Sequence, residues 1–203
     1  KIFLLANADA KGSVEGCELI NVTNLTASST MKAIAAKADD ADFVMLYTKY
    51  NTLKFAPFAI ERFVTLANDS QSAMLYADHY NVVGDQRSNA PVIDYQQGSL
   101  RDDFDFGQLV LLRASLLHDY VQQQQESALQ WAAFYDLRLY ISRKSSIFHI
   151  NEFLYTRQET DTRRSGEKQF DYVNPRNRDV QVEMEQVVTH HLEQIGALVD
   201  TSE

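Results

Sequence analysis

Blocks of apolar residues alternate with polar segments along the first half of the chain. A continuous apolar run, typical of a strand buried on both faces, occupies residues 1–6, and further strand-like runs occupy residues 17–22, 42–47 and 73–77. Apolar residues also recur at helical spacing after the capping residue Ser28 and after Pro57. Strands that alternate with helices favour a largely parallel sheet, because parallel neighbours need a connection long enough to hold a helix. The pattern therefore predicts an α/β fold.

The second half of the chain is less regular. Residues 80–99 are polar and predict an irregular connection or a short hairpin, and residues 97–112 predict a charged loop that leads into an apolar strand. Helices are predicted over residues 114–121 and 131–141, followed by an edge or mixed strand over residues 147–154. Residues 178–198 form one apolar helical face, which packs on this sheet, on a further domain, or on a second copy of the chain.

Composition narrows the class of protein. With 203 residues, of which 45% are hydrophobic and 23% charged, the chain fits one globular domain. A net charge of -9 with few basic clusters argues against nucleic acid as a partner. The single cysteine, Cys17, fits a reducing compartment, and we find no apolar run long enough for a signal or a membrane span. We therefore expect a cytoplasmic protein without a transmembrane segment, and since Lys1 begins inside an apolar run, the chain is interpreted as an excerpt of a longer one.

Common catalytic motifs are missing from the sequence. It contains no P-loop, no GxGxxG after a strand, no HExxH, no GxSxG and no cluster of Cys and His. Candidate site residues must therefore come from their place in the predicted sheet, where ligands bind beyond the carboxyl ends of the strands. Lys49 follows one predicted strand, and Asp78 and His79 follow the next. Asp78 is either a general base or a strand-end cap, and His79 is either a metal ligand beside Asp78 or a surface group.

An acidic loop precedes the apolar strand near residue 110. Asp103 and Asp105 alternate with phenylalanines, which places both carboxylates outward on one face, where they could contact the hydroxyl groups of a ligand or a metal. The alternative is a solvated acidic turn in which Arg101 pairs with a neighbour. His149 is interpreted as structural. The basic residues 163–168 are either a lid over a diphosphate or a solvated charge run.

Taken in order, these segments resemble the GT-A domain of family 2 glycosyltransferases. The matching segments are KIFLLAN, CELINVTN, TASSTMKAIAAKA, ADFVMLYTKY, FAPFAIERFVTLA, SAMLYADHY, RDDFDFGQLVLLRASLL, YDLRLYISRK and HINEFLYTR. The resemblance covers residues 1–157 and implies a three-layer, mostly parallel sheet with helices on both faces. Residues 158–203 would form a charged loop and an amphipathic helix that packs on this domain or leads to another. The family's first strand and helix would precede Lys1.

The resemblance implies transfer of a sugar from a nucleotide-diphospho-sugar donor to a saccharide or lipid-linked acceptor. Members of the family hold Mg²⁺ or Mn²⁺ with an Asp-x-Asp sequence. In this chain Tyr47, Thr48 and Lys49 occupy that position. Either no metal is used, or it is held elsewhere, with Asp78 and His79 as candidate ligands. The acidic pair that supplies the family's base is replaced by Ala133 and Phe134.

Three accounts of function remain open. In the first, the site is rebuilt: Lys49 replaces the metal charge, and Asp78, Asp103 or Asp136 is the catalytic base. Donor or acceptor binding then falls to Asn7, Lys49, Arg101, Asp102 and Asp105. In the second, the domain is catalytically degenerate and serves as an accessory, acceptor-binding or assembly module. In the third, it is a structural domain that forms a homodimer through its C-terminal helix.

Overall fold

The computed structural model describes residues 1–7, 12, 14–49, 51–124, 128–158 and 178–199. Helices and strands are interspersed along them, which confirms the α/β class. The chain divides into two compact units: unit 1 takes residues 1–41, 117–140 and 171–203, and unit 2 takes residues 42–116 and 141–170. Helices α3 (Ala114–Gln123) and α4 (Ala133–Lys144) contribute residues to both units.

Unit 1 combines helices with a small sheet. Strands β1 (Phe3–Asn7) and β2 (Glu18–Val22) pair in parallel, and helices α1 (Ser28–Lys37) and α5 (Arg178–Gln194) belong to the same unit. The Glu183 carboxylate of α5 accepts hydrogen bonds from the backbone N–H groups of Trp131 and Ala132, at 3.1 and 3.3 Å. The backbone N–H groups at the N-terminus of a helix have no partner within the helix, and these two bonds satisfy such groups at the N-terminus of α4.

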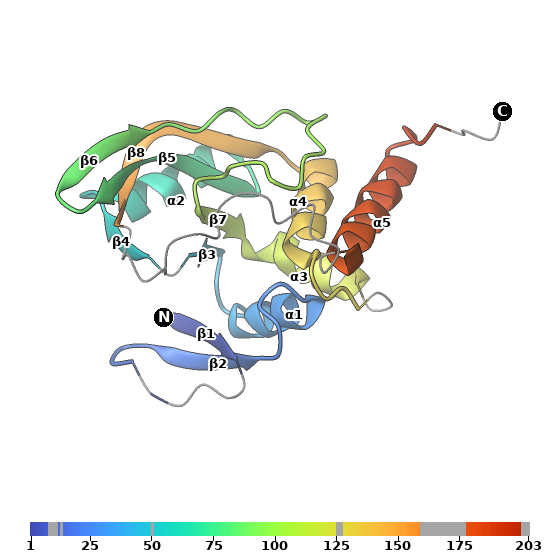
Figure 1. The fold of residues 1–203 in the computed structure, drawn as a ribbon, viewed down its shortest axis with the longest axis horizontal. Coiled ribbons are helices and arrows are strands. Elements are labelled where there is room, and N and C mark those ends of the chain that lie inside the picture. The colour runs from blue at the N-terminus through green and yellow to red at the C-terminus, as the bar shows by residue number, and fades with distance from the viewer. Residues whose placement is uncertain (8–11, 13, 50, 125–127, 159–177, 200–203) are drawn as a thin grey trace. The chain divides into compact units, whose positions relative to one another are not determined.

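Unit 2 contains a six-stranded mixed sheet (Figure 1). Its order is β3-β7-β5-β8-β4, with β6 paired to β5. The strands are β3 (Phe43–Tyr47), β4 (Thr52–Phe55), β5 (Met74–Val83), β6 (Gln86–Ala90), β7 (Leu109–Arg113) and β8 (Ile147–Gln158). Of these pairings only β5 with β8 is parallel, so the mostly parallel sheet that we expected is not present in this unit. A two-residue turn at Gly84 and Asp85 joins β5 to β6, and such turns force antiparallel pairing.

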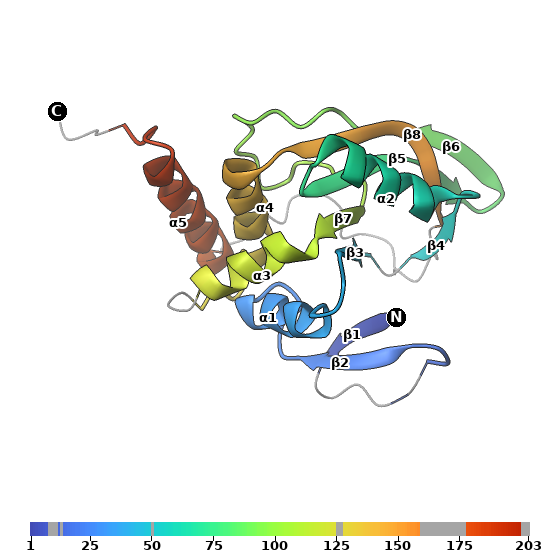
Figure 2. The same cartoon turned by 180° about the vertical axis from the view of Figure 1, so that it is seen from behind.

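The core of unit 2 lies between one face of the sheet and helix α2 (Ala59–Ser70) (Figure 2). Phe63 and Ala67 of α2 pack with Leu75 and Ala77 of β5, and all four are at most 2% exposed. Burying a phenylalanine side chain stabilises the fold by about 1.5–3 kcal/mol. Because side chains alternate along a strand, Tyr76 and its even-numbered neighbours point to the other face.

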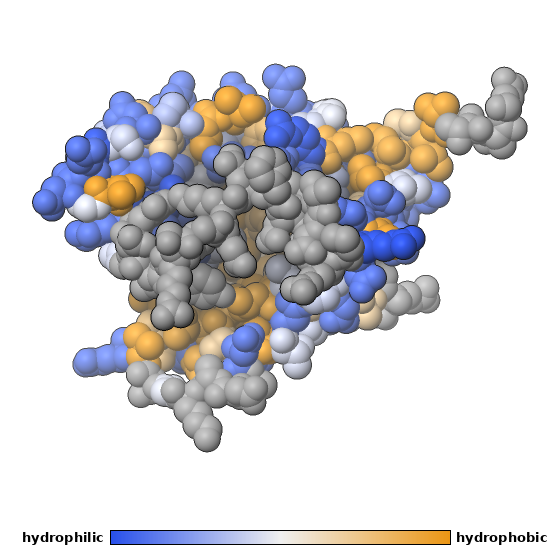
Figure 3. Space-filling model, in the orientation of Figure 1, coloured by the Kyte–Doolittle hydropathy of each residue, from blue (hydrophilic) through white to orange (hydrophobic). Residues whose placement is uncertain are grey.

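The other face of β5 is covered by the chain between β6 and β7, residues 91–108, which we call the covering segment. The Tyr76 ring makes edge contacts with Phe104 and Phe106, whose ring centroids lie 6.3 and 5.0 Å away. β8 contains a bulge where it passes Asp78 of β5, because the pairing register shifts on both sides of that residue. The outer end of the β5–β6 hairpin is largely hydrophilic (Figure 3), in line with the exposed residues of β6.

Several predicted elements are confirmed and others are corrected. The strands near residues 42–47 and 147–154 and the helix after Pro57 are present, whereas β4 was not predicted. The strand predicted over residues 73–77 continues to Val83, so Asp78 and His79 lie inside β5 and not at its end. Within the ranges given above, no helix combines the length and the apolar character needed to cross a bilayer. The basic residues 163–168 lie outside the described residues.

Candidate active site

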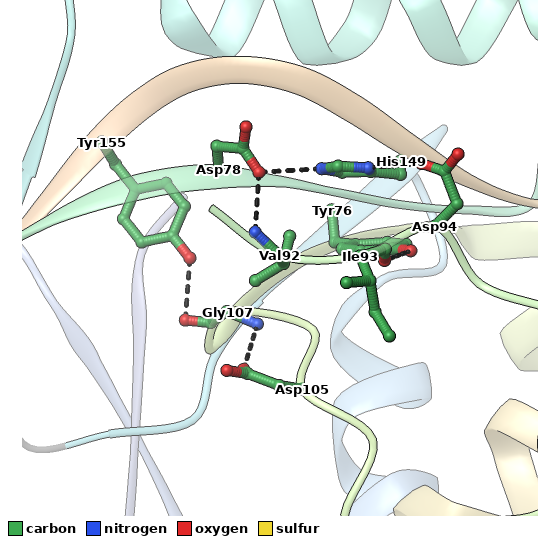
Figure 4. Close-up of polar contacts among 9 residues, drawn as sticks. All are labelled: Tyr76, Asp78, Val92, Ile93, Asp94, Asp105, Gly107, His149 and Tyr155. Atoms are coloured by element: carbon green, nitrogen blue, oxygen red, sulfur yellow. Dashed lines mark hydrogen bonds and ion pairs between the residues drawn. The ribbon is translucent and has the colours of Figure 1, made fainter. Parts of the chain in front are cut away.

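Asp78 is a buried carboxylate in the middle of β5. It is 2% exposed and points to the face opposite α2. Its Oδ1 atom accepts a hydrogen bond from the backbone N–H of Val92 at 2.9 Å, and it lies 2.9 Å from Nε2 of His149 (Figure 4). A carboxylate buried without partners would cost several kcal/mol, and these two donors remove that cost.

His149 connects Asp78 to the protein surface. It lies on β8 directly opposite Tyr76 in the parallel register, and its side chain is 6% exposed. The imidazole stacks on the Tyr76 ring with centroids 5.0 Å apart and an interplanar angle of 15°. Its Nδ1 atom lies 2.6 Å from Oδ1 of Asp94, whose side chain is 84% exposed. A buried carboxylate, a buried imidazole and an exposed carboxylate thus follow one another; we call Asp78, His149 and Asp94 the relay.

The two polar contacts of His149 limit the protonation states of the relay. A neutral imidazole carries one N–H and can donate to only one carboxylate. Hydrogen bonds on both sides of His149 therefore require an imidazolium or a protonated carboxyl group. Where the extra proton is on His149 or Asp78, the exposed Asp94 is an ionised carboxylate fixed in position by a buried partner, which is the arrangement that general-base catalysis needs.

Three bonds from β5 and β8 hold the chain around Asp94 in place. Besides the Val92 and Asp94 bonds, the Tyr76 hydroxyl donates to the carbonyl oxygen of Ile93 at 2.6 Å. Burial is the main reason that the pKa of the Tyr76 phenol is raised well above its ordinary value of 10.0, so this hydroxyl remains a donor at neutral pH. Side chains of the sheet therefore position consecutive residues of the covering segment.

A second polar cluster surrounds His79 on the α2 side of β5. The His79 ring is stacked on that of Tyr155, with centroids 5.0 Å apart, and the Tyr155 hydroxyl donates to the Gly107 carbonyl at 2.7 Å. Burial, together with Arg157, lowers the pKa of His79 below 6.5, although Asp105 and Asp78 oppose the change. His79 is therefore neutral at pH 7.

Among the described residues, some buried polar atoms of this region have no hydrogen-bond partner. They are the Tyr47 hydroxyl, Nδ1 of His79, Oδ1 of Asn81 and Oε1 of Gln108. The Asn81 side chain is still close enough to His79 to favour the protonated imidazole. Across the parts of the chain that the structure describes, no three His, Cys, Asp or Glu side chains are arranged to hold a metal. A metal held by Asp78 and His79 therefore finds no support, and their side chains point to opposite faces of β5.

The acidic loop occupies the surface, as its alternation predicts. Asp103 accepts two hydrogen bonds from the Arg101 guanidinium, both at 2.9 Å, and both side chains are exposed. This pairing matches the solvated-turn alternative. Asp102 is also exposed, whereas Oδ1 of Asp105 accepts the Gly107 N–H at 2.8 Å and its charge acts on His79. Of this group, Asp105 is the residue that the structure associates with β5.

Lys49 is an exposed residue just beyond β3. Its neighbour Thr48 donates its N–H to the Gln108 carbonyl at 2.9 Å, and the preceding Gly107 lies against Ala77 and His79 of β5. The end of β3, the start of β7 and the middle of β5 therefore lie in one row across the sheet. Two strand spacings separate the outer members, about 10 Å.

Asp136 and Asn7 belong to unit 1. Asp136 is 3% exposed and accepts hydrogen bonds from the Tyr120 hydroxyl, at 3.0 Å, and from the Gln124 side-chain amide. Burial and then the Asp136 charge raise the pKa of Tyr120 well above 10.0, so this donor remains protonated. Asn7 is an exposed residue at the end of β1, opposite Val22.

His149 and Asp94 are the site residues that the sequence did not reveal. His149 was interpreted as structural, and Asp94 sits in a polar segment without a motif. Their grouping depends on the parallel pairing of β5 with β8, which places His149 beside Tyr76. The alternation of residues 147–154 put His149 on one face of a strand, but nothing in the sequence specified its neighbour. Comparison with models of known protein families gave no match, and comparison with curated proteins gave none either.

Proposed function

We propose that the protein is a glycosyltransferase that moves a sugar from a nucleotide-diphospho-sugar to a hydroxyl group of a saccharide or lipid-linked acceptor. The order of its segments, which resembles family 2 glycosyltransferases with a GT-A fold, suggests this class. The observation that carries the proposal is the relay, because an exposed carboxylate backed by a buried His–Asp pair suits the deprotonation of an acceptor hydroxyl.

In the proposed reaction, the acceptor oxygen attacks the anomeric carbon of the donor. The bond between that carbon and the diphosphate oxygen breaks, its electron pair leaves with the nucleoside diphosphate, and the hydroxyl proton passes to the Asp94 carboxylate. His149 and Asp78 are positioning residues, since they act through Asp94. The Lys49 ammonium would stabilise the negative charge of the departing diphosphate.

A divalent metal does not fit the position that the family would use. Tyr47, Thr48 and Lys49 offer a phenol, a hydroxyl and an ammonium group, whereas Mg²⁺ and Mn²⁺ prefer carboxylate oxygens. The Lys49 charge would also repel a cation. The proposed reaction therefore contains no step that depends on a metal.

A degenerate module remains the second candidate, and a specific observation favours it. Asp136, the carboxylate nearest to the family's base position, is buried and hydrogen-bonded to Tyr120 and Gln124, so it is poorly placed to accept a proton from a substrate. If the relay is only structural, the domain would bind an acceptor or a further domain without catalysing transfer.

The test combines calorimetry with a transfer assay. Titration of UDP- and GDP-sugars with and without Mn²⁺ should reveal metal-independent binding of one donor that Lys49→Ala weakens. With that donor, Asp94→Asn should lower kcat about 10²- to 10⁴-fold and leave the donor Kd unchanged. Asp40→Asn, at an exposed aspartate of unit 1, is the matched control. Absence of binding by every donor would favour the degenerate module, and full activity of Asp94→Asn would refute Asp94 as the base.

A further inference from the structure

Three side chains from adjacent strands of unit 2 form a layered stack. The ring of Phe153 on β8 lies on that of Tyr80 on β5, with centroids 4.6 Å apart and an angle of 24°. On Tyr80 also lies the guanidinium of Arg87 from β6, whose Cζ atom is 3.4 Å from the ring centroid. We call Phe153, Tyr80 and Arg87 the stack. The two rings are half-buried and Arg87 is exposed.

The stack orients the Arg87 guanidinium. A flexible arginine loses conformational freedom when it binds an anion, but a guanidinium held against a ring has lost much of it already. Because the Arg87 side chain is exposed, its N–H groups remain accessible to a solute. Within the described residues Arg87 forms no salt bridge, although Asp85 is only two positions away. The guanidinium of Arg87 is therefore held in position, and no carboxylate of the described residues is paired with it.

The stack and the relay share one face of the sheet. Tyr76 and Tyr80 are four residues apart on β5 and therefore point to the same side, away from the α2 core. At about 3.3 Å per residue, their Cα atoms are about 13 Å apart. Asp94 lies at the Tyr76 end through His149, and Arg87 lies at the Tyr80 end. An exposed carboxylate and an exposed guanidinium thus mark two ends of one surface.

We infer that Arg87 is an anion-binding subsite for the acceptor, which carries a carboxylate or a phosphate in addition to its reacting hydroxyl. A planar guanidinium binds either anion through two parallel N–H···O bonds. On a chain with a net charge of -9, an anionic acceptor needs such a positioned cation to approach. Assignment of the subsite to the acceptor rests on the proposed transferase function, whereas anion binding by Arg87 does not.

The test is an NMR titration of the full chain that follows the Nε–Hε resonance of Arg87, identified by its loss in Arg87→Gln. The probes are methyl β-D-glucuronide for a carboxylate, glucose 6-phosphate for a phosphate, and methyl β-D-glucoside as the neutral control. We expect one anion to shift this resonance and the neutral glycoside to leave it unmoved. Arg87→Gln should raise the Kd of that anion at least tenfold, and Arg87→Lys should raise it by less, since a lysine keeps the charge but not the fork.

A matched change elsewhere separates a specific site from general charge. Lys32→Gln removes an exposed cation from α1 and should leave the Kd unchanged. The subsite is refuted if neither anion shifts Arg87, if the neutral glycoside shifts it equally, or if Lys32→Gln weakens binding as much as Arg87→Gln. A response to glucuronide alone identifies an acidic sugar, and a response to the phosphate alone identifies a phosphorylated one. An Arg87 response in a protein that transfers no sugar would retain the subsite and reject its role in transfer.

Discussion

The two faces of strand β5 have opposite characters. Leu75 and Ala77 face α2 and take part in a close-packed apolar core, whereas Tyr76 and Asp78 face the covering segment and are held by hydrogen bonds. The backbone of one strand therefore carries both the stabilising contacts and the candidate chemistry. Such a division keeps Tyr76 and Asp78 in place outside the apolar core, because the core itself makes the strand rigid.

The largest expected effect tests whether the polar face of β5 contributes to stability. Asp78→Ala should lower the free energy of unfolding by about 3–5 kcal/mol, because it leaves the Val92 N–H and His149 without a buried partner. Asp94→Ala removes the other partner of His149, but since Asp94 is largely exposed the loss should stay below about 1 kcal/mol. Urea denaturation measures both. Equal losses would mean that burial does not distinguish the two carboxylates.

The next effect tests how closely atoms pack around Gly107, on the α2 side of β5. Gly107 has a φ of +77°, and a Cβ atom placed on it would lie 2.5 Å from the Tyr155 hydroxyl oxygen and 3.2 Å from Nδ1 of His79. Gly107→Ala should therefore cost about 3 kcal/mol, from backbone strain and overpacking together.

Gly84 provides the matched control for that substitution. It also has a positive φ, +59°, but no atom would lie within 4 Å of an added Cβ. Gly84→Ala should cost only the strain, about 1 kcal/mol. If thermal or urea unfolding gave the same value for both variants, the close packing at Gly107 would be refuted.

A smaller effect is expected where the covering segment is attached. Tyr76→Phe removes the hydrogen bond from the Tyr76 hydroxyl to the Ile93 carbonyl. It should lower the free energy of unfolding by only about 1 kcal/mol, because Ile93 is exposed and its carbonyl can accept a hydrogen bond from water instead. Tyr80→Phe changes a hydroxyl on the same face that has no hydrogen-bond partner among the described residues, and should change stability by less than about 0.5 kcal/mol. Hydrogen exchange at the Val92 amide should also accelerate in Tyr76→Phe alone.

The smallest effect is a dependence on pH that originates on the α2 side. His79 has a pKa below 6.5 in the folded protein because it is buried, so between that value and 6.5 the unfolded chain binds a proton that the folded chain does not. Stability should fall as the pH drops below 6.5 and level off below the folded pKa. His79→Phe keeps an aromatic ring against Tyr155 and should flatten this part of the curve. At pH 8 the imidazole is neutral in both states, so the difference there gives the pH-independent cost of the substitution.

Local patterns predicted the elements of this protein better than their pairing. The runs that contain Phe43 and Leu109 are strands of the sheet, and the helix after Pro57 packs through Phe63, as periodicity indicated. Pairing depends on contacts between residues far apart in the chain, such as Met74 with Ile147, which no local pattern specifies. The mixed sheet was therefore missed.

The same reason explains the outcome for the site. Asp78 was recognised from its position next to an apolar run, but its partner His149 is 71 residues further on, and Asp94, which contacts His149, is 16 residues further on. Hydrophobic patterning shows which residues are inside, and it does not show which buried polar groups meet. Asp136 was recognised by resemblance, and its bond to Tyr120 likewise depends on how two helices pack.

The bulge in β8 makes this region more sensitive to chain length than to side-chain identity. Its additional residues near Glu152 let His149 stack on Tyr76 while Tyr155, further along the strand, stacks on His79 on the opposite side. Deleting one residue there would turn every later side chain of the strand to the other face of the sheet. Leu154 would then leave the core, and a polar neighbour would enter it. Homologous or engineered chains should therefore accept many substitutions at the bulge but no single-residue insertion or deletion.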